Sequence, residues 1–158
     1  MFWLKGGISE DRILELNIHK TALLDLCVSK ATSSHPRKWS QNNPAYGQSL
    51  VVALIIRHFF GGEVLCASLE KMPGYEKLGR HYWNQLSDGS EVDLSCEQFN
   101  DGFRDLVPNG DVVSVEYLLS DPDVKRRYKM VYDKYHAFLA IILKTRVYIE
   151  KFVKGRMT

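Results

Sequence analysis

The sequence is poor in cysteine, and its three cysteines form no recognisable motif. Cys27, Cys66 and Cys96 are an odd number with no CxxC spacing and no metal-ligand spacing, so a complete disulfide framework and a cysteine-based zinc site are both excluded. Cys27 and Cys66 lie in apolar runs and are expected to be buried thiols, and Cys96 is interpreted as a structural thiol. Unpaired thiols are typical of a reducing compartment, so we expect a cytoplasmic protein.

Long hydrophobic runs are also missing. No uninterrupted apolar run exceeds the length of Ala137–Leu143, whereas a transmembrane helix needs roughly 20 such residues. The N-terminal MFWLKGG has no basic region followed by an apolar stretch, so we expect no signal peptide. The remaining composition, 45% hydrophobic and 25% charged, is ordinary for a globular protein. We expect one domain over residues 1–158.

Charge is nearly balanced overall but unevenly distributed. The net charge is +2, yet residues 125–158 hold ten Lys or Arg and two acidic residues, and the remainder holds 11 basic and 17 acidic residues. The C-terminal segment therefore carries +8 and the rest −6. This segment is interpreted as a solvated basic helix face, with an acidic partner as the alternative. Nucleic-acid binding by residues 125–156 is a weaker hypothesis, because their apolar content suits packing better.

The pattern of apolar residues predicts three helices. Ser9 to about Lys30 has a broad apolar face with Ser9 as its cap. Gly47–Phe60 is apolar nearly all round and predicts a central buried helix that ends at Gly61-Gly62. A long helix is predicted from Ser120, as its cap, to about Phe152. Residues 31–46, rich in Ser, Asn and Pro, predict a loop.

Strands are predicted only in the middle of the chain. Residues 63–69 resemble one strand, and residues 78–86 with 91–95 predict a β-hairpin around the turn 87–90. A short helix or turn is predicted at residues 97–103. Because the strands cluster instead of alternating with helices, the sequence predicts an α+β fold with a small antiparallel sheet.

Three segments carry residues that can perform chemistry together: NPAYGQS before the apolar helix, HYWN on one strand, and Asp93 on the next. A nucleophile at a helix N-terminus gains from the helix dipole, a histidine on an adjacent strand can take its proton, and a carboxylate can orient that histidine. His81 and Asp93 share a face only if the turn has an odd residue count or a bulge. The alternatives are an ordinary strand histidine and a carboxylate that braces a turn.

The stretch from Trp39 to about Tyr128 resembles the YunG-like family of small bacterial proteins. The resemblance is carried, in order, by NPAYGQS, GGEV, HYWNQLSDGSEVDLS followed by QF, and EYLLSDPDVKRRY. HYWN followed by VDL is also similar to papain-like and transglutaminase-like enzymes, which use a Cys-His-Asp or Cys-His-Asn triad. The resemblance implies a thiol-hydrolase-like core over residues 39–128, flanked by an N-terminal helical extension over 1–35 and a C-terminal basic amphipathic helix over 120–155.

Carried over residue by residue, the resemblance makes Ser49 the nucleophile, His81 the general base and Asp93 the orienting residue. The family pattern has GQC where this chain has Gly47-Gln48-Ser49. A thiol is partly ionised near neutral pH, whereas a serine hydroxyl is far less acidic. Three explanations stay open: an engineered Cys-to-Ser change, a natural pseudoenzyme, or a working serine nucleophile.

Further residues have candidate roles beside this triad. Gln48 and Asn43 could donate to an oxyanion, with loop hydrogen bonding as the alternative. Tyr82, Trp83 and Asn84 could line a substrate cleft, although core packing is the ordinary role of strand aromatics, and Asn84 is expected to point away from His81.

The function expected from these residues is a thiol-hydrolase-like enzyme acting on an amide or ester carbonyl, in the peptidase, amidase, deamidase or acyl-transferase class. Serine at position 49 is expected to weaken or abolish that activity. The alternative is a non-catalytic module that binds a protein through the cleft or the basic C-terminal helix. No metal or organic cofactor is implied. The expected partner is a protein or peptide, with self-association through the C-terminal helix as a further hypothesis.

Overall fold

Short strands form one antiparallel sheet in the order β1-β4-β3-β2-β5 in the part of the chain that the structure describes. This computed structural model describes residues 2–99 and 103–155. The strands are β1 (Trp3–Lys5), β2 (Glu63–Ser68), β3 (Arg80–Gln85), β4 (Glu91–Asp93) and β5 (Asp111–Val113). Helices packed on an antiparallel sheet confirm the expected α+β class.

The β3–β4 hairpin has a three-residue turn. The N–H of Leu86 donates to the carbonyl of Ser90 at 2.8 Å, which leaves residues 87–89 between the paired positions. Gly89 has φ +84°, the left-handed conformation that such a turn requires. Asn84 lies opposite Val92. The turn therefore has the odd number of residues that His81 and Asp93 need in order to lie on one face of the sheet.

The helix α2 (Ser49–Phe60) covers one face of the sheet. Seven of its residues are buried, namely Ser49 and the run Val51–Ile56, which confirms the predicted central helix. Gly61 ends α2, and its N–H donates to the carbonyl of Arg57. The side chain of Asn84 on β3 donates to the carbonyl of Ala53 at 2.9 Å, so the helix is bound to the strand as well as packed on it.

The opposite face of the sheet holds a second core. Alternation along β2 and β3 directs Leu65, Ala67, His81 and Trp83 to the face that α2 does not cover. This face is covered by the connections after β2 and β4, whose buried residues include Leu69, Met72, Phe99 and Val107. The sheet therefore separates the α2 core from a smaller core that contains Trp83.

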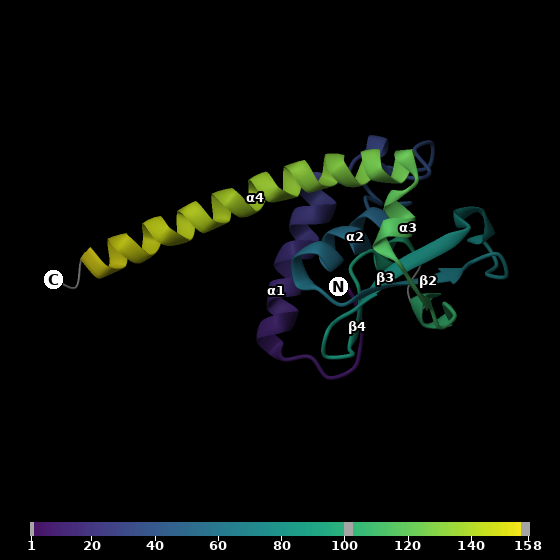
Figure 1. The fold of residues 1–158 in the computed structure, drawn as a ribbon, viewed down its shortest axis with the longest axis horizontal. Helices are drawn as coiled ribbons and strands as arrows, with labels where there is room; N and C mark the ends of the chain where they lie inside the picture. The colour runs from purple at the N-terminus through teal and green to yellow at the C-terminus, as the bar shows by residue number, and fades with distance from the viewer. Residues whose placement is uncertain (1, 100–102, 156–158) are drawn as a thin grey trace.

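The remaining helices flank the α2 core. α1 (Glu10–Thr21) continues as a π-helical segment (Ala22–Cys27), and α4 (Pro122–Gly155) packs on both this segment and α2. Figure 1 shows that α4 extends well past the body of the protein. Within the described residues, no helix is both long enough and apolar enough to cross a membrane.

The structure corrects the predicted start of the long helix. Ser120 ends the short helix α3 (Val115–Leu119), and Asp121 instead caps α4, because its Oδ1 accepts from the N–H groups of Asp123 and Val124. The edge strands β1 and β5 and the helix α3 were not expected. Residues 1–35 consequently contribute a strand to the sheet in addition to their helix, and Trp3 of β1 lies opposite Asp93.

Candidate functional site

His81 and Asp93 form a buried pair. The Nε2 atom of His81 lies 2.6 Å from Oδ2 of Asp93, and the two residues are 0% and 1% exposed. His81 is the second residue of β3 and Asp93 the last of β4, and the odd turn places both on one face. The structure therefore brings together two of the three residues proposed for the triad.

Gln98 occupies the other nitrogen of the imidazole. Its Nε2 lies 2.7 Å from Nδ1 of His81, and its Oε1 accepts from the backbone N–H of Gly47 at 3.4 Å. A backbone N–H can only donate, so the amide oxygen of Gln98 must face Gly47 and the amide nitrogen must face His81. His81 then accepts at Nδ1 and carries its proton on Nε2, which donates to Asp93.

Arg104 and Ser95 complete the surroundings of Asp93. The Nε of Arg104 donates to Oδ2 at 2.7 Å, and the backbone N–H and hydroxyl of Ser95 donate to Oδ1 at 3.0 and 2.9 Å. Burial acts to raise the pKa of Asp93, but the interactions with His81, together with Arg104 and Ser95, outweigh burial and lower the pKa. Asp93 is therefore held as a carboxylate that can orient the imidazole.

Two tryptophans enclose the Arg104 side chain. The guanidinium carbon lies 4.0 Å from the ring centre of Trp3 and 4.4 Å from that of Trp83, within cation–π range. Trp83 is also stacked on His81, with ring centres 5.7 Å apart. A pocket of about 350 Å³ adjoins this group and is lined by Trp3, Trp83, Arg104, Glu91, Asp105 and others. Trp83 thus links the buried histidine to a pocket on the same face of the sheet.

Ser49 is separated from this group. It is the first residue of α2 and is 6% exposed, and its hydroxyl makes no hydrogen bond with His81 or with any other residue that the structure describes. α2 packs on the sheet face opposite to the one that His81 occupies. The chain of contacts from His81 through Gln98 to Gly47 is the route by which the histidine connects to the segment before Ser49.

The two amides considered as oxyanion donors have different surroundings. Gln48 is fully buried, donates to the carbonyl of Ser29 at 2.8 Å and accepts from the hydroxyl of Thr32 at 3.0 Å, so its side chain holds the preceding loop. Oδ1 of Asn43 is buried and has no hydrogen-bond partner among the described residues. An oxyanion needs donors, so the proposed role of Asn43 falls to its amide Nδ2 and not to this oxygen.

The three residues proposed to line a cleft, Tyr82, Trp83 and Asn84, do not lie on one face of the sheet. Trp83 lines the pocket described above. Asn84 is buried and holds α2 through Ala53, on the opposite face from His81, as expected. Tyr82 packs partly buried against the α2 side of the sheet, where burial, followed by the neighbouring Cys66, raises the pKa of its hydroxyl to about 12.

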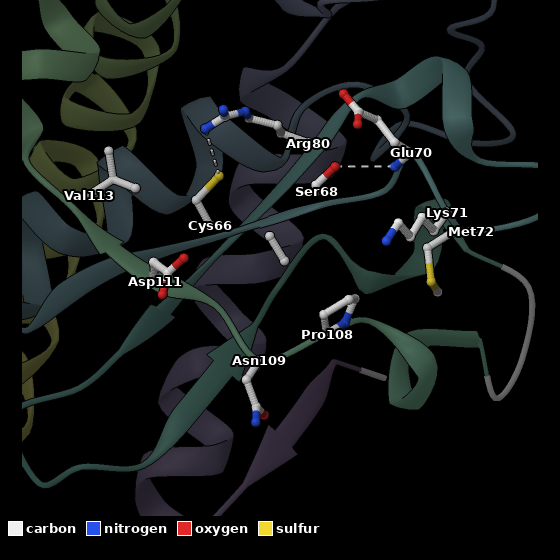
Figure 2. Close-up of a pocket in the computed structure, with 11 residues that line it drawn as sticks. Cys66, Ser68, Glu70, Lys71, Met72, Arg80, Pro108, Asn109, Asp111 and Val113 are labelled. Carbon is white, nitrogen blue, oxygen red and sulfur yellow. Dashed lines mark hydrogen bonds between the residues drawn. The ribbon is translucent and has the colours of Figure 1, made fainter.

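A larger pocket lies at the β2–β5 side of the sheet and is shown in Figure 2. Its volume is about 460 Å³, and its lining includes Cys66, Lys71, Arg80 and Asp111. Cys66 accepts from Nη1 of Arg80 at 3.9 Å, a contact drawn in Figure 2. Neither His81 nor Ser49 lines this pocket, so it is separate from the histidine group.

Sequence reasoning did not find Gln98 or Arg104. Gln98 follows Asp93 by five residues, in the QF pair after the second strand, and its spacing gave no reason to place it at His81. Arg104 lies in a short helical turn (Phe103–Leu106), and its signal was only an arginine in a segment without regular periodicity. Both residues reach the site from irregular chain that folds back over the sheet.

Comparison with known proteins places the chain in a family. No curated protein and no solved structure matches the chain. A family model described as YunG protein matches residues 18–140, which is well over half of the sequence. The matched range contains Ser49, His81, Asp93 and Gln98. The chain therefore belongs to the YunG family.

Proposed function

We propose that the chain is a thiol-hydrolase-like protein with an acyl-transfer centre, in which residue 49 is the nucleophile, His81 the base and Asp93 the orienting residue. The proposed architecture is a papain-like or transglutaminase-like core, with the nucleophile position at the N-terminus of a helix packed on an antiparallel sheet. The observation that carries the proposal is the tautomer of His81. Its proton is on Nε2 toward Asp93, and its lone pair at Nδ1 accepts from the amide of Gln98, whose oxygen accepts from the backbone N–H of Gly47.

In the proposed reaction, Gln98 first moves away from Nδ1. The residue at position 49 attacks the carbonyl carbon of an amide or ester, and its proton passes to Nδ1 of His81. The resulting oxyanion accepts hydrogen bonds from the first backbone N–H groups of α2, which have no partner within the helix. The carbon–nitrogen or carbon–oxygen bond then breaks, the leaving group takes the proton from His81, and water releases the acyl group in a second attack.

Serine at position 49 makes this centre weak. Because a serine hydroxyl is much less acidic than a thiol, it needs a base in direct contact. In this structure the base is engaged by Gln98 and is completely buried. We therefore expect little or no hydrolysis by the chain as written, and a thiol at the same position to recover a reactive nucleophile.

The test is the reactivity of a thiol placed at position 49. Ser49→Cys protein is treated with a chloroacetamide probe, and the labelled site and rate are read by intact and peptide mass spectrometry. The same change combined with His81→Ala is the matched control. Fast labelling at residue 49 that depends on His81 supports the proposal, whereas labelling that is indifferent to His81 overturns it.

The natural thiols give a low background for this experiment. Burial raises the pKa of Cys27 to about 11, and burial together with Asp93 raises that of Cys96 to about 11. A thiol with that pKa has roughly two orders of magnitude less thiolate near neutral pH than one with a pKa of about 8.5. Labelling at Cys66, which is buried, is followed separately by peptide mapping.

A second candidate function is non-catalytic binding. The observation that favours it is the occupied Nδ1 of His81, together with the Trp3–Arg104–Trp83 pocket on the same face. In this reading the His81–Asp93–Arg104 group holds the pocket in shape and performs no proton transfer. Two results together would favour this second candidate. The thiol at position 49 would be labelled slowly and independently of His81, and substitutions in the His81–Asp93–Arg104 group would lower the stability of the protein.

A further inference from the structure

The last part of α4 leaves the body of the protein. Val131 and Tyr135 are fully buried against the body, whereas Ile142 and Leu143 are 45% and 61% exposed. We call residues 141–155 the overhang, because Figure 1 shows this part of α4 extending past the other elements. At 1.5 Å per residue it is about 22 Å long. Exposed branched apolar side chains on a projecting helix indicate a surface that is covered by something else.

A second exposed apolar surface lies on α1 and the π-helical segment. Leu14, Ile18 and Leu26 are 63%, 50% and 60% exposed. Acidic residues flank them, because Glu10, Asp11, Glu15 and Asp25 are all exposed. We call these seven residues the α1 stripe. Glu15 is paired with Arg12 at 2.6 Å, while Asp11 and Asp25 make no ion pair with the residues that the structure describes.

The two surfaces match in charge and length. In sequence, residues 141–155 contain Lys144, Arg146, Lys151 and Lys154 and a single acidic residue, Glu150, so the formal charge of the overhang is opposite to that of the α1 stripe. The twelve residues of α1 span about 18 Å, close to the length of the overhang. Two overhangs packed on each other would instead bring like charges together, which is unfavourable.

The overhang cannot reach the α1 stripe of its own chain. α4 is one continuous helix, and in Figure 1 its overhang points away from α1. We propose that the chain forms a two-fold dimer in which the overhang of each copy packs along the α1 stripe of the other. The two contacts are equivalent by symmetry, so the same pair of surfaces is used twice and the assembly closes.

The test is the mass of the protein in solution, measured by light scattering after size-exclusion chromatography and by sedimentation over about 5 to 500 µM. We expect a concentration-dependent dimer that weakens as salt rises from about 0.05 to 0.5 M, because the charges are exposed and screened. Ile142→Glu with Leu143→Glu, and separately Leu14→Glu with Ile18→Glu, should each give a monomer. Val112→Glu, a change at an equally exposed apolar residue outside both surfaces, should leave the dimer intact.

Mixing the two monomeric variants gives a sharper test. One has an intact α1 stripe and the other an intact overhang, so the mixture can form one of the two contacts and should recover part of the dimer. A dimer that survives the α1 changes but not the overhang changes would overturn the proposed pairing in favour of overhang against overhang. A monomer at every concentration and salt would overturn dimerisation itself. All variants are at exposed positions, and circular dichroism checks that they fold.

Discussion

The amide nitrogen of Gln98 lies 2.7 Å from Nδ1 of His81, at the position that an attacking nucleophile would need. The other end of the same amide accepts from the backbone of Gly47. One side chain therefore occupies the proposed base and connects it to the segment before Ser49. Replacing Gln98 therefore distinguishes the two proposals: a catalytic centre whose base is covered by Gln98, and a hydrogen-bond network with a structural role only.

Replacing Gln98 should increase reactivity at position 49 while lowering stability. In Ser49→Cys protein, the further change Gln98→Ala removes the group that occupies Nδ1, so we expect faster chloroacetamide labelling. Losing a buried hydrogen bond should lower the free energy of unfolding by about 1–3 kcal/mol. Labelling rates and urea unfolding curves measure the two effects. Gln48→Ala is the control, because it removes a buried amide that does not contact His81; an equal gain in labelling there would contradict the role of Gln98.

Asp93 should make the protein sensitive to acid. Its pKa is lowered in the folded state from the usual 3.8, so its stabilising contribution is complete above about pH 4 and is lost as the pH falls through the folded-state pKa. Asp93→Asn should remove that part of the acid dependence and lower stability near neutral pH by about 3 kcal/mol, because Arg104 is left buried without its carboxylate. Asp111→Asn, at an exposed residue of the edge strand β5, serves as the comparison. Thermal or urea unfolding between pH 3 and 7 measures both; an unchanged pH profile for Asp93→Asn would count against this account.

Arg104 should not be replaceable by lysine. Its guanidinium lies between Trp3 and Trp83, and its Nε donates to Asp93; an ammonium group has no flat face to stack between the two rings while it donates. We expect Arg104→Lys to lower stability by about 1–3 kcal/mol and to change the tryptophan emission spectrum. Arg126→Lys, on the exposed side of α4, should alter neither quantity. An unchanged spectrum for Arg104→Lys would show that the stacking contributes little.

Gly47 is required where the chain approaches the site. It has φ +69°, and a Cβ at this position would lie 2.5 Å from the Ser33 hydroxyl. Gly47→Ala should therefore lose more stability than Gly89→Ala, which has a similar φ of +84° but open space around it. The left-handed strain is common to both, about 1 kcal/mol, so the difference measures the close contact alone. Urea unfolding of the two variants provides the comparison, and equal losses would mean that Ser33 moves aside freely.

The parts of the fold that the sequence predicted are those with a strong periodic pattern. α2 was evident from an apolar run ended by two glycines, and the β3–β4 hairpin from alternation around a polar turn. β1 and β5 have three residues each, which is too short for alternation to be recognised, and they exist because they pair with neighbouring strands. Tertiary pairing of this kind is not visible in local sequence.

The site was predictable to the same limited extent. His81 and Asp93 flank one turn, so their proximity follows from local register. Gln98 and Arg104 come to the same place through irregular chain, where no periodic rule applies. The position of Ser49 relative to His81 depends on which face of the sheet α2 covers, and a sequence that is apolar on both faces does not specify this.

The three-residue turn between β3 and β4 has a consequence for how this sequence can change over evolution. Side chains alternate along a strand, so inserting or deleting a single residue at 87–89 would turn Asp93 to the far side of the sheet from His81. A change of two residues would preserve the pairing. Relatives that keep the His–Asp contact should therefore differ here in steps of two, or compensate a single insertion with a bulge in one strand. Whether the number of residues in this turn is odd or even therefore indicates, from sequence alone, whether a relative can keep the His–Asp contact.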